Sequence, residues 1–318
     1  MQLEATQPVS ATAPTGIGRN VVVGAGRLEL PTLAVAFVVH GGFVLLTLFF
    51  RDMPLLVSAP LGSLLLAWYG SLQHETIHGH PTSSRRFNAM LGALPLSLWL
   101  PYAVYRETHL RHHRHNGRYL TKSGRDPESF YLPAGEFSRT ASVLRWLYAA
   151  NCTLAGRLIF GPAIALATFW AGEIRKIRGG DRWRLRVWLQ HAVGVCLVLA
   201  WIVGVCHINP LVYMAVMVYP SVALGQLRSF VEHHADTDSR RRTRVVESRS
   251  IWALVFLNNN LHIAHHAHPK VPWYELPRVW RRMRHPAQAQ GLVFGGGYLE
   301  VARKYLFRPY INLDRDGS

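Results

Sequence analysis

The sequence predicts an all-α integral membrane protein with four transmembrane helices in two hairpins, interfacial helices and a cytoplasmic histidine-rich cap. Three observations lead to this fold class. Apolar residues make up 49% of the 318 residues and charged residues only 17%, below the roughly 25% of a soluble domain. The apolar residues come in blocks of about 20, the length that crosses a bilayer as a helix. Basic and histidine-rich segments separate these blocks.

Six segments are apolar enough to be considered as membrane spans. The first of them, "TLAVAFVVHGGFVLLTLFF", contains no Asp, Glu, Lys or Arg. In chain order the segments are 32–50, 54–72, 88–104, 151–171, 188–206 and 210–227.

The charged residues reduce the six segments to four crossings. The loops 105–125, 172–186 and 228–249 are rich in Lys and Arg, which is typical of cytoplasmic loops. In contrast, "RDMP" (51–54) and "HINP" (207–210) are short and poor in basic residues, as expected for turns on the far side. If the first two segments form one hairpin and the last two another, all basic loops fall on one side.

The remaining segments, 88–104 and 151–171, are therefore expected to lie in the membrane interface or to re-enter it. The first contains Pro95 and Pro101, which interrupt a helix. The second contains Arg157 near its middle, and a charge is costly at the centre of a bilayer.

The ends of the chain are predicted to lie outside this membrane domain, on the cytoplasmic side. Residues 1–30 are polar, rich in glycine and lack the apolar core of a secretory signal, so we expect a flexible tail. The membrane domain is expected over 31–285, followed by a C-terminal tail over 286–318.

The net charge of +17 arises from 35 Lys and Arg against 18 Asp and Glu. Such an excess favours an anionic membrane surface or an acidic protein partner. Basic and aromatic residues do not alternate as in a nucleic-acid groove, so no nucleic acid is expected. The cysteines lack CxxC spacing and predict neither a disulfide framework nor a thiolate metal site; they are Cys152, Cys196 and Cys206.

Most of the 17 histidines fall into four clusters. These are "HETIH" (74–78), "HLRHH" (109–113), "EHH" (232–234) and "HIAHH" (262–266). On a helix, residues three and four positions apart lie on one face, so each helical cluster directs its imidazoles into one volume. With four crossings, all four clusters fall on the cytoplasmic side.

The histidines predict a metal site. Imidazole suits Fe, Zn, Cu and Ni, and one zinc ion needs only three or four ligands. Nine histidines in matched clusters suit two metal ions side by side, and two irons can together activate dioxygen. Other histidines lie just outside the repeating pattern and are predicted to be neighbours of the site or surface residues: His80, His115, His234 and His268.

The motifs HxxxH, HxxHH and HxxHH, in this order and separated by hydrophobic hairpins, resemble those of the membrane fatty acid desaturase–hydroxylase superfamily. The resemblance extends from about residue 32 to about residue 285. It implies a ligand from the region between the second and third motifs, where His233 is our choice and His234 the alternative. The remaining ligands implied by the motifs are His74, His78, His109, His112, His113, His262, His265 and His266.

The same resemblance implies a non-haem di-iron centre, dioxygen as co-substrate and two electrons from a ferredoxin or cytochrome b5 type donor. Glu75 stands where the family often has Asp, and either carboxylate can orient a ligand imidazole. Glu232 is predicted to lie next to the ligands. Asn258, Asn259 or Asn260 is expected to face the iron through water, with Asn259 as our choice.

By resemblance, the expected function is a fatty acyl desaturase that introduces a C=C bond. The first alternative is a lipid hydroxylase or a carotenoid ketolase or hydroxylase, because "HHAHPKVPW" (265–273) is similar to the corresponding segment of carotenoid ketolases. The second alternative is a non-enzymatic membrane metal-binding protein or transporter. Against it, the spans contain few polar residues that would form a pathway.

The expected partners follow from the membrane setting. The bilayer would supply an acyl-lipid or acyl-thioester substrate. The segment 268–284 combines aromatic and basic residues, which suits anionic lipid or an acidic electron-transfer protein. The loop 124–131, "GRDPESFY", is expected either to contact a lipid head group or to form an ordinary turn.

Overall fold

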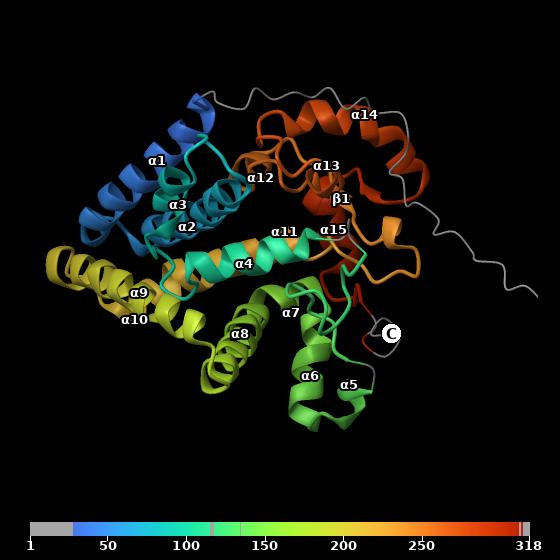
Figure 1. The fold of residues 1–318 in the computed structure, drawn as a ribbon, viewed down its shortest axis with the longest axis horizontal. Coiled ribbons are helices and arrows are strands. Elements are labelled where there is room, and N and C mark those ends of the chain that lie inside the picture. The colour runs from blue at the N-terminus through green and yellow to red at the C-terminus, as the bar shows by residue number, and fades with distance from the viewer. Residues whose placement is uncertain (1–27, 115–117, 134, 312, 314–318) are drawn as a thin grey trace, which may run out of the picture.

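The computed structural model describes residues 28–114, 118–133, 135–311 and 313 (Figure 1). Within these residues, four helical units are long and apolar enough to cross a membrane, which confirms the predicted fold class. The units are α1 (Leu30–Leu48); α2 (Leu55–His78); α9 (Arg182–Leu199) with its π-helical continuation η3 (Ala200–Val205); and α10 (Pro210–Tyr213), π-helical η4 (Met214–Val218) and α11 (Tyr219–Ser229) in series.

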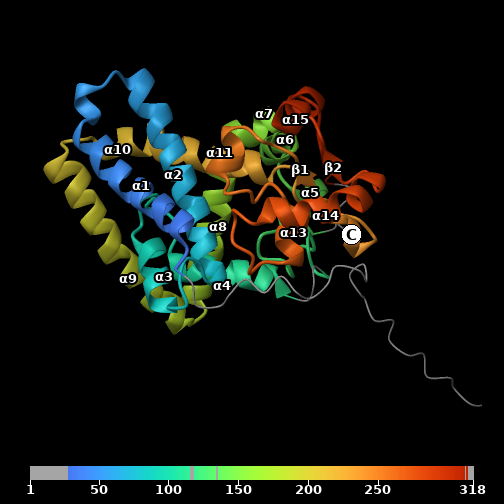
Figure 2. The same ribbon diagram turned by 90° about the horizontal axis from the view of Figure 1, so that it is seen from above.

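These units form the two expected hairpins. The 3₁₀ turn η1 (Phe50–Asp52) connects α1 to α2, and Asn209 caps the start of α10 after the second turn. Gly79 ends α2 with φ of 103°, a left-handed conformation that glycine adopts readily. The helix therefore stops directly after His78. Figure 2 shows α1, α2, α9 and α10 at one end of the molecule and α13, α14 and α15 at the other.

The segments 88–104 and 151–171 do not form spanning helices. The first is divided between two helices by a turn in which Leu98 has φ of 65°. The second breaks at Phe160, and its longer helix ends in the basic sequence 175–178. Their interfacial position stays a prediction. The helices are α3 (Arg85–Ala93) and α4 (Tyr102–His112), then α7 (Leu154–Ile159) and α8 (Gly161–Arg178).

The remaining elements form a cap beyond the spans. Its two short strands pair in parallel, with Val245 opposite Val293. The elements are α5 (Glu136–Arg139), α6 (Ser142–Asn151), η5 (Ser239–Arg241), β1 (Val245–Val246), α12 (Ile251–Val255), α13 (His262–Ala267), α14 (Leu276–Ala289), β2 (Val293–Phe294) and α15 (Gly297–Tyr305).

Most of the segment expected as a C-terminal tail packs against the domain. Tyr298 and Val301 of α15 are buried in the same cluster as Phe256. The Tyr310 backbone N–H donates a hydrogen bond of 2.8 Å to the Cys152 carbonyl. Residues 286–311 thus form part of one packed unit with the cap. An N-terminal tail was predicted over residues 1–30. Residues 1–27 of it lie outside the described residues.

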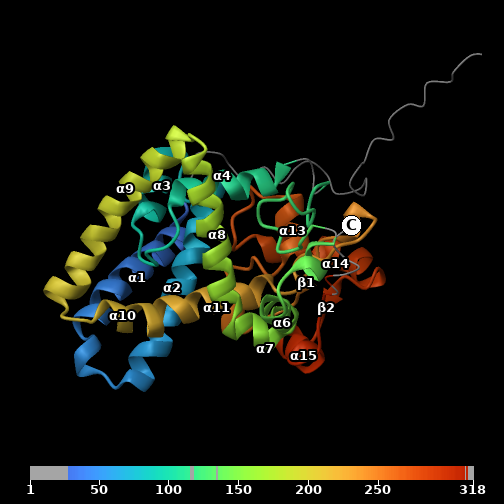
Figure 3. The ribbon, with the colours of Figure 1, turned by 90° about the horizontal axis from the view of Figure 1, so that it is seen from below.

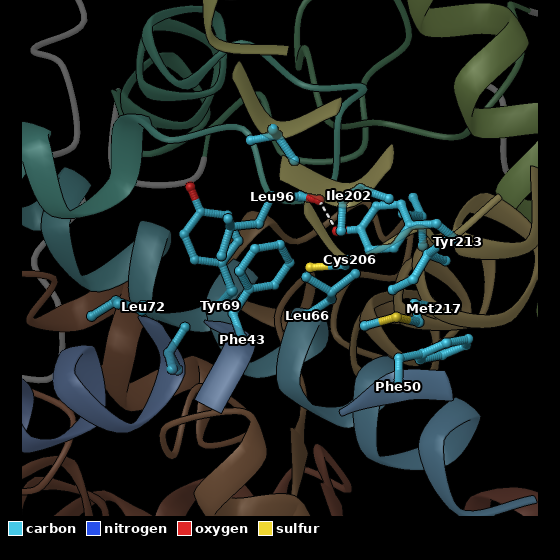
Figure 4. Packing of buried hydrophobic residues seen from close by; sticks show 14 of the residues in the cluster. Phe43, Phe50, Leu66, Tyr69, Leu72, Leu96, Ile202, Cys206, Tyr213 and Met217 are labelled. Carbon is cyan, nitrogen blue, oxygen red and sulfur yellow. Dashed lines mark hydrogen bonds between the residues drawn. The ribbon is translucent and has the colours of Figure 1, made fainter. Parts of the chain in front are cut away.

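The core between the spans also positions the turn before α4. Figure 4 shows Tyr69 of α2 and Tyr213 of α10 among buried apolar side chains. The Tyr69 hydroxyl donates a hydrogen bond of 2.7 Å to the Gly92 carbonyl, and the Tyr213 hydroxyl donates to the Leu96 carbonyl. Because an unmade buried hydrogen bond is costly, these contacts fix the turn, and with it the start of α4, against the spans.

An ion-pair network around the buried Arg184 joins α4, α8 and α9. The Arg184 guanidinium lies 2.7 Å from both carboxylate oxygens of Glu173 and 3.0 Å from Glu107. The Asp181 side chain caps the start of α9 by accepting from the Arg184 N–H, so the helix begins six residues before the predicted span. Removing one partner of such a pair leaves a buried charge uncompensated. The network therefore secures the helix that carries three clustered histidines.

A tight helix contact gives a test of this packing. A Cβ at Gly156 would lie 2.0 Å from the Ala150 carbonyl oxygen, whereas a Cβ at Gly172 would meet nothing within 4 Å. We expect Gly156→Ala to destabilise the detergent-solubilised protein by about 1–3 kcal/mol through overpacking. Gly172→Ala should leave stability unchanged or raise it, since alanine favours a helix. Thermal unfolding followed by circular dichroism compares them, and equal midpoints would contradict the packing.

Candidate metal centre

Four parts of the chain bring histidines to one place. His74 and His78 lie one turn apart at the end of α2, next to the glycine that stops the helix. The second group lies on α4, the third follows α11, and the fourth lies on α13. The helical spacing decides which histidines of a group share a face.

The nine histidines form two clusters, each with ligand atoms within 4.8 Å of one another. Helices α4 and α13 contribute to both, because histidines next to one another on a helix point in different directions. We call these sets the first and the second cluster. The first cluster consists of His74, His78, His109, His113 and His265, and the second of His112, His233, His262 and His266.

The spacing of the imidazole nitrogens fits a metal ion with ligands at right angles. In the first cluster, the Nε2 atoms of His78 and His113 lie 2.9 Å and 3.1 Å from Nε2 of His109. In the second, Nε2 of His233 lies 3.0 Å from Nε2 of His262. Ligands at about 2.1 Å give neighbours about 3.0 Å apart at right angles and about 3.4 Å apart in a tetrahedron.

The other ring nitrogens show why these Nε2 atoms point at a cation. Nδ1 of His109 lies 2.9 Å from Glu128, and Nδ1 of His112 lies 2.8 Å from Asp126. A carboxylate only accepts, so each Nδ1 carries the proton and each Nε2 presents a lone pair. Lone pairs 3 Å apart repel one another unless a cation lies between them. The donor set therefore fits bound metal.

Burial keeps the imidazoles of α13 in the form that binds metal. Burial first, and the neighbouring imidazoles second, lower the pKa of His262, His265 and His266 well below its usual range. His112 behaves differently. Burial would lower its pKa, but the Glu128 charge and the Asp126 hydrogen bond raise it above the usual value. The neighbouring carboxylates therefore make His112 a more basic ligand than the histidines of α13.

Asp126 and Glu128 are site residues that the sequence interpretation missed. Their loop was expected to contact a head group or to form a turn, yet both carboxylates face ligand imidazoles. Asp126 is buried and also accepts from the backbone N–H groups of Thr121 and Glu128. The signal in the sequence was two acids close behind a histidine motif, but no spacing rule links them to particular histidines.

The two carboxylates predicted from the sequence lie beside the clusters. Glu75 Oε1 is 3.6 Å from His74 Nδ1, and its other oxygen accepts from the Trp273 N–H at 3.1 Å. Glu232 is buried, with Oε2 3.7 Å from both His262 Nε2 and Arg228. Burial raises the pKa of Glu232 to about 7.

Of the three asparagines, Asn259 lies between the two clusters. Its Nδ2 is 3.3 Å from His74 Nε2, and its Oδ1 is 3.1 Å from His262 Nδ1. Asn258 and Asn260 instead donate to backbone carbonyls. Asn259 therefore contacts a histidine of each cluster, while its contact with iron through water stays a prediction.

The alternative ligand His234 belongs to neither cluster among the described residues. Its ring packs against Tyr310, with centroids 5.1 Å apart. His80 lies 2.6 Å from Glu29, which connects the end of α2 to the start of α1. His268 is the C-cap of α13 and lies outside both clusters, and His115 lies outside the described residues.

Comparison with known proteins supports the interpretation of the site. The model of the family described as fatty acid desaturase matches residues 52–297, more than half of the chain. The match contains all nine clustered histidines. No curated protein matches the chain.

Metal content tests the ligand assignment. We expect the purified protein to hold two metal ions per chain, one for each cluster. His265→Ala removes a ligand from the first cluster and should lower the content towards one ion, because the second cluster keeps all its imidazoles. His268→Ala, a matched change just outside the clusters, should keep both. Elemental analysis measures this, and full metal content in His265→Ala would contradict the assignment.

A second test addresses the carboxylate behind His112. Asp126→Asn should weaken metal binding in the second cluster roughly 10- to 100-fold, because the ligand loses the charged acceptor that orients it. Asp238→Asn, at a half-exposed carboxylate that pairs with Arg240 and belongs to neither cluster, should have no effect. Competition with a chelator measures both. Equal retention in the two variants would show that Asp126 does not support the metal.

Proposed function

Because the chain belongs to the fatty acid desaturase family, we propose that it is an oxidoreductase that introduces a C=C bond into a fatty acyl chain. The substrate would be an acyl-lipid or an acyl thioester, and the reaction would use dioxygen and two electrons. In balance, loss of two hydrogens from neighbouring carbons, with O₂, two electrons and two protons, yields the alkene and two water molecules. The single observation that carries the proposal is the pair of histidine clusters within the family match.

Iron is the metal that fits both the site and the reaction. Imidazole is a suitable ligand for iron, and iron can change its oxidation state whereas zinc cannot. Five imidazoles in the first cluster and four in the second would hold one iron ion each. Two iron ions held there would supply the dioxygen activation and the removal of hydrogen.

The chain's own residues would hold and shield this centre. His74, His262 and His265 are almost fully buried. Their burial keeps bulk water away from the reacting atoms, which limits side reactions. The carboxylates of Asp126 and Glu128 would hold two ligand rings in orientation through Nδ1. Asn259, in contact with both clusters, would keep them at a fixed separation.

An oxygenase of the same superfamily is the second candidate. It is favoured by the segment 265–273, which is similar to that of carotenoid ketolases. Insertion of oxygen and removal of a second hydrogen share the same metal centre, so the clusters suit both reactions. A metal transporter fits less well, because a transport site lies near the middle of the spans. Here the first cluster includes two histidines at the end of α2, and both clusters draw on α13 of the cap.

The two electrons would come from an acidic carrier protein of the ferredoxin or cytochrome b5 type. Helix α14 packs on α13, which carries three clustered histidines. Arg281 and Arg282 are exposed on α14, whereas Arg284 pairs with Glu247. Excess positive charge attracts an acidic partner and speeds encounter. We propose that this face and both chain ends lie in the cytoplasm.

Lipid analysis tests the reaction. We expect a host that expresses the chain to accumulate acyl chains lacking two hydrogens, and a host with the His265→Ala variant to lack them. The variant loses a cluster imidazole but should keep the membrane helices. Mass spectrometry of total lipids, with fragmentation to locate the bond, makes the measurement. Gain of one oxygen, in acyl chains or in a supplied carotenoid, would instead establish the oxygenase.

A further inference from the structure

Several helices outside the four spans expose large apolar side chains. We call this set the apolar rim. Its members are between 40% and 79% exposed, and Phe307 is the most exposed of them. They are Val143, Leu144 and Trp146 of α6, Ile159 of α7, Ile251 and Leu254 of α12, and Leu299, Leu306 and Phe307 in and after α15.

The exposed residues lie on definite helix faces. In α12, Ile251 and Leu254 are three positions apart, and Val255 faces the core. In α15, Leu299 is exposed whereas Tyr298 and Val301 are buried, and Leu306 and Phe307 are exposed directly after the helix ends. These short helices are therefore amphipathic. One face packs against the rest of the protein, and the other face is exposed among the described residues.

The rim is one surface rather than scattered residues. The Ala155 N–H of α7 donates to the Leu306 carbonyl at 2.9 Å. The ring of Trp252 on α12 lies 6.3 Å from that of Tyr298 on α15. Helix α6 packs against α7, and α6, α7 and α15 overlap when the molecule is viewed from above or from below (Figures 2 and 3). A contiguous apolar surface of this kind marks an interaction site.

The surface continues into the sides of the spans. The Tyr219 hydroxyl of α11 donates to the Ile159 carbonyl of the rim. The Ser71 hydroxyl of α2 donates to the Val255 carbonyl at 2.7 Å, directly beside Leu254. The helices of the rim thus adjoin two helices that would contact lipid.

The charged residues point to the same environment. Arg145 lies next to Trp146, Arg303 lies between Leu299 and Leu306, and Arg308 follows Phe307, and all three arginines are exposed. Arginine and tryptophan together are typical of a helix that lies in the head-group region of a membrane.

The opposite part of the cap has a different character. In the fully described stretch 255–298, no large hydrophobic side chain is exposed. Helix α14 buries Leu276, Val279 and Trp280 within the cap and exposes Arg281 and Gln288. The cap is therefore two-sided, with an apolar side that adjoins the spans and a polar side formed by α14.

We propose that the apolar rim is inserted into one leaflet of the bilayer, so that α6, α7, α12 and α15 are embedded at the level of the lipid head groups. The partner is a bilayer with anionic lipid, whose phosphates would pair with the arginines. Embedding of about 5–10 Å is usual for such helices. The C-terminal segment would then be a membrane anchor of the cap, whereas α14 faces water.

Spin labels at single cysteines measure the depth directly. The background is Cys196→Ser, which removes the exposed native cysteine and keeps the buried Cys152 and Cys206. Labels are placed by Phe307→Cys and Ile251→Cys in the full-length, metal-loaded protein in vesicles of phosphatidylcholine and phosphatidylserine. Collision rates are recorded with oxygen, which concentrates in the bilayer, and with a water-soluble nickel chelate.

Two further positions provide matched references. Leu197→Cys lies on α9, where lipid contact is expected, and Gln288→Cys lies on the polar face of α14. We expect the ratio of oxygen to nickel collisions at both rim positions to exceed that at Gln288→Cys several-fold and to approach that at Leu197→Cys. Unchanged metal content confirms that each variant is folded.

Two outcomes would overturn the inference. A ratio at both rim positions equal to that at Gln288→Cys would place the rim in water. Exclusion of both reagents would show that a protein, a second copy of the chain or another partner, covers the rim instead of lipid. Neither result depends on turnover, so a failure here is distinguishable from a failure of the proposed reaction.

Discussion

The convergence of imidazole lone pairs is the interaction on which the arrangement of this protein depends. In each cluster, Nε2 atoms lie about 3 Å apart, while Asp126 and Glu128 hold the protons on the opposite ring nitrogens. Such an assembly repels itself without a cation, so metal binding would contribute to the stability of the folded cap. Four separate parts of the chain must meet for this to occur. The site therefore constrains how the chain folds as well as which ligand the imidazoles can bind.

The rest of the structure brings these four parts together and keeps them there. The hydroxyl groups of Tyr69 and Tyr213 fasten the turn before α4 to the spans, and Arg184 fastens α4 to α8 and α9 through carboxylates. Gly79 stops α2 where its last histidine reaches the first cluster. These contacts are buried, and each would be costly to break. Rigid support of this kind is what a metal centre requires of its surroundings.

The two-sided cap relates the site to the membrane. Its apolar rim adjoins α2 and α11, and its polar side is formed by α14 on top of α13. If lipid contacts the rim, a hydrophobic substrate would approach from one side and an electron carrier from the other.

The four spans and the histidine motifs could be predicted from the sequence alone, because length, hydropathy and helical spacing are local properties. The choice of His233 over His234 came from the family resemblance, and His233 is the one that lies in a cluster. The sequence did not reveal that α4 and α13 each serve both clusters, or that Asp126 and Glu128 support them. It also placed a tail where β2 and α15 pack into the cap. These features were decided by the tertiary structure, since they depend on which distant segments lie against each other. Spacing along one helix gives the direction of a side chain, but not what it meets.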